Sequence, residues 1–393
     1  MSVFEDLVGQ EAVVAQLQAA ADAAARLVAG EPEGAGGMTH AWLFTGPPGS
    51  GRSIAARAFG AALQCERGTG CGHCTSCDQA LSGAHPDVAV IVPEGLSLGV
   101  KEAREIIIRS SRAPTRGRWQ VTLIEDADRL TEDGTNALLK ALEEPPPSSV
   151  ILLSAPSVED LLPTVRSRCR LAPLRTPPSE AVAEVLVRRD GVDPAMAAFA
   201  ARAAQGHIGR AKRLATDEAA RAERREVLSL PRSLQGVGSA LAAAKALFEA
   251  AQEESGKLTK DRDAAEKESL STALGAGATG KGVTGAARRS AGALKELEKR
   301  QKSRGTRTQS DALDRALVDL AAFYRDVLQV QLDTGSALVH GDLAAQAATI
   351  ARATTPESTL RRVDAVLACR EALDANVNPL LAVEAMALAL RTG

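Results

Sequence analysis

A phosphate-binding loop is recognisable at residues 46–53, which read Gly-Pro-Pro-Gly-Ser-Gly-Arg-Ser. In the pattern G-x-x-x-x-G-K-[ST], backbone N–H groups surround a phosphate chain, the lysine meets the β- and γ-phosphates, and the hydroxyl binds Mg²⁺. Gly46, Gly49, Gly51 and Ser53 are in place, but Arg52 stands at the lysine position. A planar guanidinium is not equivalent to a compact ammonium group. The loop therefore predicts a site for ATP or ADP with Mg²⁺, and leaves open whether this chain hydrolyses the nucleotide.

Two acids lie where such a loop needs them. Glu125 and Asp126 end the apolar run at 120–125. A phosphoryl-transfer site needs one acid to hold the Mg²⁺ shell, and a second acidic or polar group to orient the attacking water. The usual order is aspartate and then glutamate, and here that order is reversed. The pair predicts an altered catalytic element, and the alternative is an ordinary charged strand end.

Four cysteines fall within thirteen residues at the spacing Cys-x5-Cys-x2-Cys-x2-Cys, namely Cys65, Cys71, Cys74 and Cys77. In a reducing cytoplasm such a cluster indicates a metal site rather than a disulfide framework. Four thiolates suit tetrahedral Zn²⁺ and leave no position for water, so the predicted site is structural. His73 can replace a ligand, and an iron–sulfur cluster or free thiols are the alternatives.

Apolar runs alternate with helical periodicity through the first half of the chain. Strands are expected at 41–44, 88–92, 120–125 and 150–154, and helices at 3–30, 53–64, 100–109 and 133–143. This alternation predicts an α/β domain built on a parallel sheet. After Leu174 strand signals nearly vanish, short helices are expected over 177–215, and almost everything from Glu218 onward is helical.

One segment of the helical half is unusual. Five glycines fall within 275–285, between charge-rich stretches at 253–267 and 288–307. We expect a flexible tip between two solvated helices. Residues 288–307 hold eight Lys or Arg against two Glu, a net +6, so a phosphate-contacting surface competes with a solvated helix face. No aromatic residue is interleaved there, which argues against stacking on single strands.

Composition excludes some classes of protein. The 393-residue chain carries a formal net charge of −2, so its global charge does not indicate a nucleic-acid binder. Aromatic residues are only 2%, which favours helices packed through alanine and aliphatic side chains. No apolar run reaches the length of a membrane span, and residues 1–8 lack a signal-peptide pattern. We expect a cytoplasmic protein of two or three domains with no membrane partner.

With these residues collected, the chain resembles bacterial DNA polymerase III clamp-loader subunits of the AAA+ class. The resemblance runs from residue 3 to about 215, resumes weakly near the C-terminus, and does not explain residues 255–310. It is carried by the four-cysteine module directly after the loop helix and by the segments Phe4–Gln10, His40–Gly46, Asn136–Pro146, Leu162–Cys169 and Asn376–Pro379.

Within that family the resemblance is to the delta-prime type of subunit. The motor type keeps the lysine and the aspartate–glutamate order, whereas the delta-prime type has a degraded ATP site, as Arg52 and the reversed acids indicate here. The resemblance implies that Arg168, in Ser167-Arg168-Cys169, is an arginine finger acting in trans on a neighbouring subunit's ATP. It places Ser154 at the sensor-1 position, and Gly209 near the place of a second sensor arginine.

The resemblance also implies an architecture and partners. We expect an AAA+ domain over 1–173 with the zinc module at 65–77, a helical lid over 174–225 and a helical collar over 226–393, with the insertion at about 255–310. The implied partners are motor (gamma/tau) and delta subunits in a pentameric ring, the sliding clamp and primer–template DNA. No polymerase activity of its own is implied. The alternatives are an ATPase-active motor subunit and a stand-alone AAA+ DNA-binding or recombination-mediator protein.

Overall fold

The computed structural model describes residues 2–31, 37–274 and 283–393, with side chains of the last range from residue 292 onward. The chain divides into two compact units. The first holds Met1–Pro93 and Ser97–Thr216, and the second holds Glu94–Leu96 and Asp217–Gly393. Most of the glycine-rich tip expected at 275–285 lies outside the described residues.

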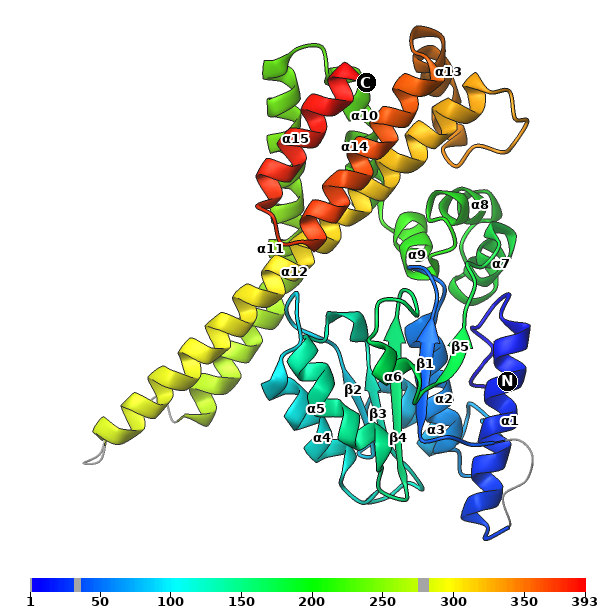
Figure 1. The fold of residues 1–393 in the computed structure, drawn as a ribbon, viewed down its shortest axis with the longest axis vertical. Helices are drawn as coiled ribbons and strands as arrows, with labels where there is room; N and C mark the ends of the chain where they lie inside the picture. Colours follow the sequence, from blue (N-terminus) through cyan, green and yellow to red (C-terminus); the bar gives the residue numbers. More distant parts are fainter. Residues whose placement is uncertain (1, 32–36, 275–282) are drawn as a thin grey trace. The chain divides into compact units, whose positions relative to one another are not determined.

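The first unit is built on a parallel sheet, as the alternating pattern predicted. In its described part five strands lie in the order β2-β3-β4-β1-β5, and every neighbouring pair is parallel (Figure 1). The strands are β1 (Ala41–Thr45), β2 (Val88–Ile91), β3 (Gln120–Ile124), β4 (Ser149–Ala155) and β5 (Arg170–Pro173). The helices are α1 (Glu11–Val28), α2 (Arg52–Leu63), α3 (Thr75–Ser82), α4 (Val100–Ser110), α5 (Glu132–Glu143), α6 (Pro163–Arg166), α7 (Ser179–Asp190), α8 (Pro194–Ala203) and α9 (Ile208–Thr216), with a 3₁₀ turn η1 at Ala127–Arg129.

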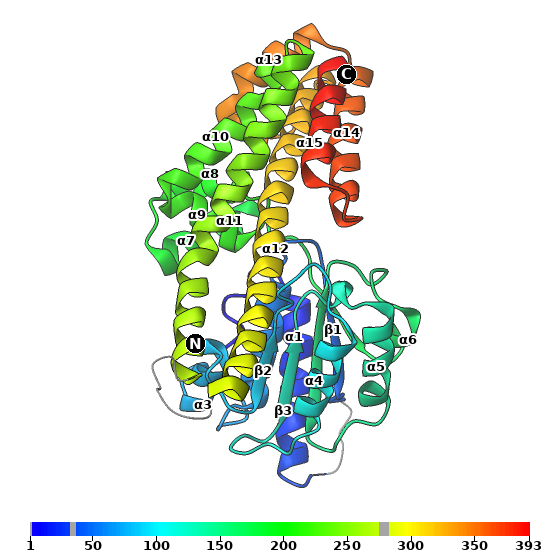
Figure 2. The same ribbon diagram turned by 90° about the vertical axis from the view of Figure 1, so that its left-hand side faces the viewer.

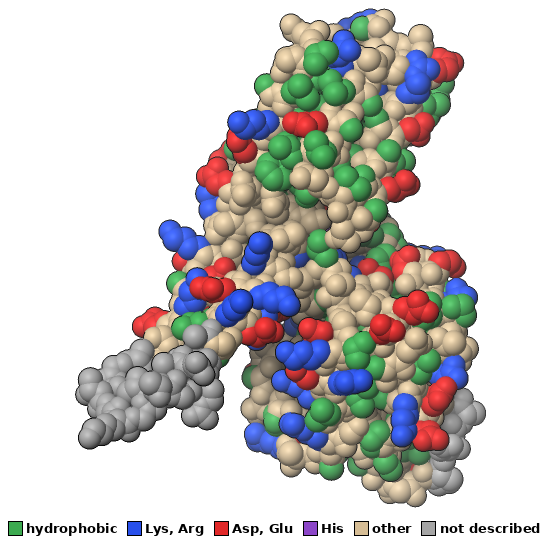
Figure 3. Space-filling model, turned by 60° about the vertical axis from the view of Figure 1, so that its left-hand side comes forward, with side chains coloured by type: hydrophobic (Ala, Val, Ile, Leu, Met, Phe, Trp, Pro, Cys, Tyr) green, Lys and Arg blue, Asp and Glu red, His purple; other side chains and the backbone are tan. Residues whose placement is uncertain are grey.

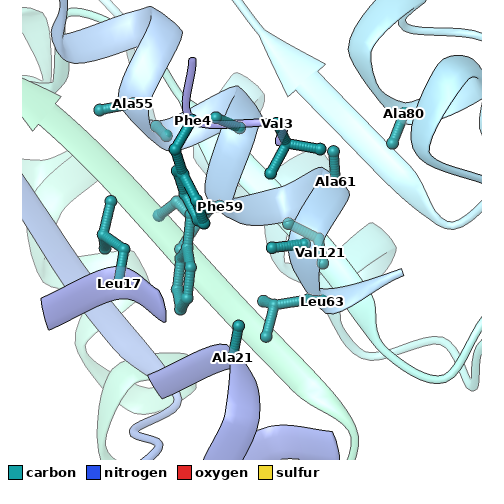
Figure 4. Close-up of a cluster of buried hydrophobic side chains, with 14 of the residues drawn as sticks. Val3, Phe4, Leu17, Ala21, Ala55, Phe59, Ala61, Leu63, Ala80 and Val121 are labelled. Carbon is teal, nitrogen blue, oxygen red and sulfur yellow. The ribbon is translucent and has the colours of Figure 1, made fainter. Parts of the chain in front are cut away.

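Helices cover both faces of the sheet because successive strand residues point to opposite sides. Trp42 and Phe44 join the cluster formed with α1 and α2, whereas Ala41 and Leu43 join the cluster formed with α4 and α5. Phe59 of α2 lies at the centre of the first cluster, with its ring centroid 4.9 Å from that of Trp42 (Figure 4). Both faces of the strands β1, β3 and β4 are therefore buried, which favours apolar residues along them.

The sheet has two functionally different edges because all strands run the same way. The carboxyl edge receives the segments that follow β1, β3 and β4, namely the 46–51 loop, the Glu125–Asp126 pair and the residues after Ala155. The amino edge receives the segments that precede the strands. Since β4 lies between β1 and β3, the loop and the acid pair meet at one edge.

The second unit is helical in its described part. Its helices are α10 (Glu218–Ser233), α11 (Val237–Ala273), α12 (Val283–Gln331), α13 (Ala344–Ala353), α14 (Pro356–Asp374) and α15 (Pro379–Thr392), with a 3₁₀ turn η2 at Gly341–Leu343. Helices α11 and α12 lie side by side (Figures 1 and 2). Ala240, Ala244, Leu247 and Ala251 recur at helical spacing on the buried face of α11, which explains how an alanine-rich sequence forms this core.

The expected lid helices α7, α8 and α9 cluster with the first unit, and α10 clusters with the second. The division into an AAA+ domain, a lid and a collar remains a prediction. Among the described residues, no helix combines the length and apolarity that spanning a membrane requires.

Candidate nucleotide site and metal centre

The 46–51 loop depends on glycine at three positions. The backbone φ angles of Gly46, Gly49 and Gly51 are +151°, +87° and +91°, conformations that other residues rarely adopt. A Cβ at Gly49 would lie 2.5 Å from the Cβ of His207, and one at Gly46 would lie 2.6 Å from the carbonyl oxygen of Leu174. The loop therefore packs against the segment after β5 and against the start of α9.

Arg52 folds back over this loop. It is the first residue of α2, and its Nη1 donates a hydrogen bond to the carbonyl oxygen of Gly46. Burial lowers the pKa of the guanidinium, and nearby acids, Asp126 most strongly, oppose that shift. The cation that stands at the phosphate-binding position thus has an acceptor within its own loop. Ser53 follows it in the first turn of α2.

The acids at the end of β3 also have partners within the chain. Glu125 Oε1 accepts hydrogen bonds from Arg57 Nε at 3.0 Å and from Arg57 Nη2 at 2.8 Å. Asp126 has a left-handed backbone, with φ +47°, and lies 4.0 Å from Arg129. Burial, followed by the charge of Asp126, raises the pKa of Asp128. Arg57 therefore neutralises the residue that stands where a magnesium-holding aspartate is usual.

Ser154 and the sensor region lie at the same edge. Ser154 is 1% exposed within β4, in register with Phe44 of β1, two residues before Gly46. Gly209 lies in the first turn of α9, where a Cβ would come 3.4 Å from His207 Cε1. The structure thus brings the predicted loop, acid pair and sensor positions together at the carboxyl edge. Their roles in binding nucleotide stay predictions.

Gln10 is a site residue to which the sequence pattern gave no role. Its amide nitrogen donates to the carbonyl oxygens of Ser50 at 3.2 Å and Arg175 at 2.5 Å, and its Oε1 accepts from Arg175 N at 3.1 Å. The side chain is 4% exposed. Gln10 therefore ties the loop to the segment entering α7. The only sequence signal for it was its place in the Phe4–Gln10 segment.

Arg168 lies away from this group, at the amino edge. It immediately precedes Cys169 and β5, a strand whose four residues span about 13 Å. Its Nη1 donates to Thr164 O at 2.6 Å and Ser167 Oγ at 3.1 Å, and its Nη2 forms an ion pair with Glu143 at the end of α5. The side chain remains 32% exposed. The arginine and the chain's own phosphate loop therefore lie at opposite edges of the sheet.

The four predicted cysteine ligands converge. The sulfur atoms of Cys65, Cys71, Cys74 and Cys77 all lie within 4.8 Å of one another, and all four residues are buried. Such a cluster can hold a metal ion, because four thiolates at this separation can close a tetrahedral shell. Cys65 follows α2 and Cys77 lies on α3, a helix that the sequence analysis did not predict.

Local hydrogen bonds favour the thiolate form of two of these cysteines, Cys65 and Cys74, whereas Cys77 Sγ donates to Ala61 O and burial raises its pKa. Cys65 Sγ accepts from the backbone N–H of Cys71, and Cys74 Sγ accepts from that of Cys77, both at 3.4 Å. His73 has other partners, since its Nδ1 lies 2.7 Å from Cys71 O and its Nε2 2.8 Å from Arg67 Nη1. The four cysteines can therefore close the metal shell without His73 as a ligand.

A glycine-rich loop between a strand and a helix, on a parallel sheet covered by helices, is the arrangement of a P-loop fold. Two sequence families match the chain, one described as DNA polymerase III, delta subunit, over residues 32–178, and one described as DNA polymerase III, delta subunit, C terminal, over residues 308–392.

The chain is also similar to individual proteins. The chain is 38% identical over 160 residues to the DNA polymerase III subunit delta' of Escherichia coli, a match that covers 39% of this chain and 47% of that protein. It is 35% identical over 189 residues to the subunit gamma/tau of Mycobacterium tuberculosis, covering 47% of this chain and 31% of that one. A solved gamma subunit-related protein of Thermotoga maritima aligns with 96% of this chain and 99% of its own at 16% identity, with a TM-score of 0.39.

The resemblance to delta-prime subunits is thus confirmed by sequence families and by individual relatives. The matched stretch spans about a third to a half of the length of these curated relatives. Residues 179–307, which include α11 and much of α12, lie between the two family matches.

Proposed function

We propose that the chain is a delta-prime-type subunit of the DNA polymerase III clamp loader, assembled with motor (gamma/tau) and delta subunits. In this role it assists the ATP-dependent loading of the sliding clamp onto primed DNA and does not hydrolyse ATP itself. The observation that carries the proposal is the place of Arg168. A cation one strand length from its own loop, and partly exposed, suits a nucleotide held by another subunit.

Arg168 then acts by electrostatics and positioning. Bonds to Thr164, Ser167 and Glu143 restrain the guanidinium, and its Nε–H remains to meet a γ-phosphate. An arginine supplied in trans neutralises charge that develops during phosphoryl transfer, and it accelerates hydrolysis by about 10³ to 10⁵.

The chain's own loop has the opposite character. Arg52 is bonded to Gly46, and Arg57 neutralises Glu125. A loop closed in this way keeps its shape without needing a nucleotide, although ATP or ADP with Mg²⁺ can compete for it. Both contacts support a subunit that is a fixed partner rather than a motor.

The cysteine cluster fits Zn²⁺ in a structural role. Four buried sulfurs supply the softness and number of ligands that zinc takes in closed sites. The ion would join the end of α2 to the start of α3.

The test is a reconstituted loader in which only the motor subunit adjoining Arg168 keeps a working loop. Arg168→Ala should leave ring assembly intact and lower single-turnover hydrolysis by at least about 10³-fold. Arg166→Ala, two residues earlier, is the matched control and should retain the rate. Normal hydrolysis and clamp loading by the Arg168→Ala ring would contradict the assignment.

A motor subunit is the second candidate, because the gamma/tau relatives match a longer stretch than the delta' relative does. The isolated chain separates the two. We expect its ATP turnover to equal that of Ser53→Ala, at background. Turnover that Ser53→Ala abolishes would favour the motor.

A further inference from the structure

The paired helices α11 and α12 form an arm that lies mostly between the two family matches. We call residues 253–273 of α11 and 292–311 of α12 the helical arm. The contact between its helices is polar. Ser255 Oγ donates to Gly305 O at 2.8 Å, and Gln301 Nε2 donates to Asp263 O at 2.9 Å. These contacts fix the register of the two helices, so the arm is a defined surface.

Arg304 is the central cation of this contact. Its side chain is 9% exposed and pairs with Asp263 and Glu266 of α11. The hydrogen bonds and charge of Arg304 bring the pKa of Glu266 down to about 2 against the effect of burial. The charge of Arg304, one basic residue of the 288–307 segment, is therefore paired inside the arm with two acids of the facing helix.

Three lysines lie on the opposite side of α12. Lys295, Lys299 and Lys302 are spaced i, i+4 and i+7, which places them on one helix face, and Arg304 is about half a turn away from that face. All three are exposed, and none forms an ion pair within the described residues. They extend over about 10 Å of helix.

The acids of the arm are distributed differently from these lysines. Asp263 and Glu266 of α11 pair with Arg304. On α12, Glu298 lies closer to the three lysines around the helix axis than Glu296 does. Figure 3 shows Lys and Arg side chains among acidic ones over the helical surface. The three lysines thus form a line of cations on α12, with Glu298 beside it.

We propose that this lysine face, Lys295, Lys299 and Lys302, binds the phosphate backbone of duplex DNA. Phosphates recur every 3.4 Å of axis along each strand, so about 10 Å of lysines spans roughly three of them. The arm contains no aromatic residue on which unpaired bases could stack, so a duplex is favoured over a single strand. The proposal adds a DNA contact to the proposed function but does not depend on Arg168.

The test uses the full chain alone, with a fluorescent 30-base-pair duplex titrated at several salt concentrations. The triple variant Lys295→Gln, Lys299→Gln and Lys302→Gln loses three phosphate contacts. The plot of log K against log salt should therefore become less steep, by about 2.7 in slope. At 0.1 M salt the same loss weakens binding by more than about a hundredfold. Glu298→Gln should tighten binding. The matched control is the triple variant Lys101→Gln, Lys212→Gln and Lys245→Gln, which should change affinity less than about threefold.

Equal binding by the lysine-face variant and the wild-type chain would overturn the proposal, and so would an equal loss in the control. A preference for single-stranded DNA that the lysine-face variant abolishes would also overturn it. Because this assay contains no other subunit, its result is independent of the loader experiment on Arg168.

Discussion

The two edges of the parallel sheet use arginine in opposite ways. At the carboxyl edge, Arg52 bonds to Gly46 and Arg57 to Glu125, so both cations are satisfied by groups of the same site. At the amino edge, Arg168 is held on one side by Thr164 and Glu143 and stays about one-third exposed.

This difference shows that residue type alone does not decide whether a cation is satisfied by groups near it. Arg52 stands in the sequence pattern of a nucleotide site, yet its contacts close that site. Arg168 stands in no general catalytic pattern, yet about a third of its side chain stays exposed.

The largest effect is expected at the four-cysteine cluster, where we propose a structural zinc ion. Cys74→Ser should abolish stoichiometric zinc and destabilise the first unit by several kcal/mol, because structural zinc contributes about 10–16 kcal/mol of apparent binding free energy in small zinc domains. Metal content by mass spectrometry and thermal unfolding measure the two effects. Cys369→Ser, in the second unit, should keep the zinc. One bound zinc and an unchanged Tm in Cys74→Ser would show that Cys74 is not a ligand of a structural metal ion.

Asp87 is predicted to hold the loop before β3 at the same edge. Its carboxylate accepts from the backbone N–H groups of Thr115, Arg116 and Gly117. Burial raises the pKa of Asp87, but these donors outweigh it and bring the pKa to about 2, from an ordinary value of 3.8. The pKa of Asp87 is therefore lower in the folded protein than in the unfolded one. At pH values above the unfolded pKa, the ionised carboxylate stabilises the fold by about 2 kcal/mol.

That stability is present above about pH 4 and is lost as the pH falls toward 2. Asp87→Ala should remove about 3 kcal/mol at pH 7, since buried donors are left without their acceptor. Urea unfolding between pH 2 and 7 checks both statements. If wild type and variant lose stability in parallel as pH falls, the assigned role of Asp87 is wrong.

At the carboxyl edge, Arg52→Lys should open the loop. A lysine at this position is the ordinary phosphate ligand, so we expect nucleotide affinity to rise about tenfold, or 1.4 kcal/mol. Hydrolysis should stay at background because Arg57 still holds Glu125. Calorimetric titration with ATP measures the change, and Arg52→Ala, which opens the loop without adding an ammonium, is the control. An affinity no higher than that of Arg52→Ala would mean that the arginine does not close the site.

The smallest effect is expected at Glu143. An ion pair between partly exposed side chains is worth about 0.2–1 kcal/mol, and glutamine keeps an oxygen acceptor. Glu143→Gln should therefore lower the loader's hydrolysis rate only about two- to threefold. Glu144→Gln, at the adjacent position, should leave the rate unchanged. A rate that rises in Glu143→Gln would indicate that the carboxylate restrains Arg168 instead of positioning it.

Several features were predictable from the sequence because their signals are local. The 46–53 loop, the four-cysteine spacing and the apolar runs of β1, β3 and β4 each depend on neighbours along the chain. Strand β5 and helix α3 were missed, because β5 is four residues long with Leu171 partly exposed, and α3 lies within the cysteine module.

Which charged side chains have partners within the fold depends on the tertiary structure and not on sequence spacing. Arg57 and Glu125 are 68 residues apart, and Asp87 meets its donors 28 to 30 residues away. Arg304 and the lysines of α12 belong to one basic run, yet the run divides into a buried and an exposed face only when α11 packs beside it. Sequence spacing determines which residues share an element, but a cation's role depends on the acceptors that folding brings to it.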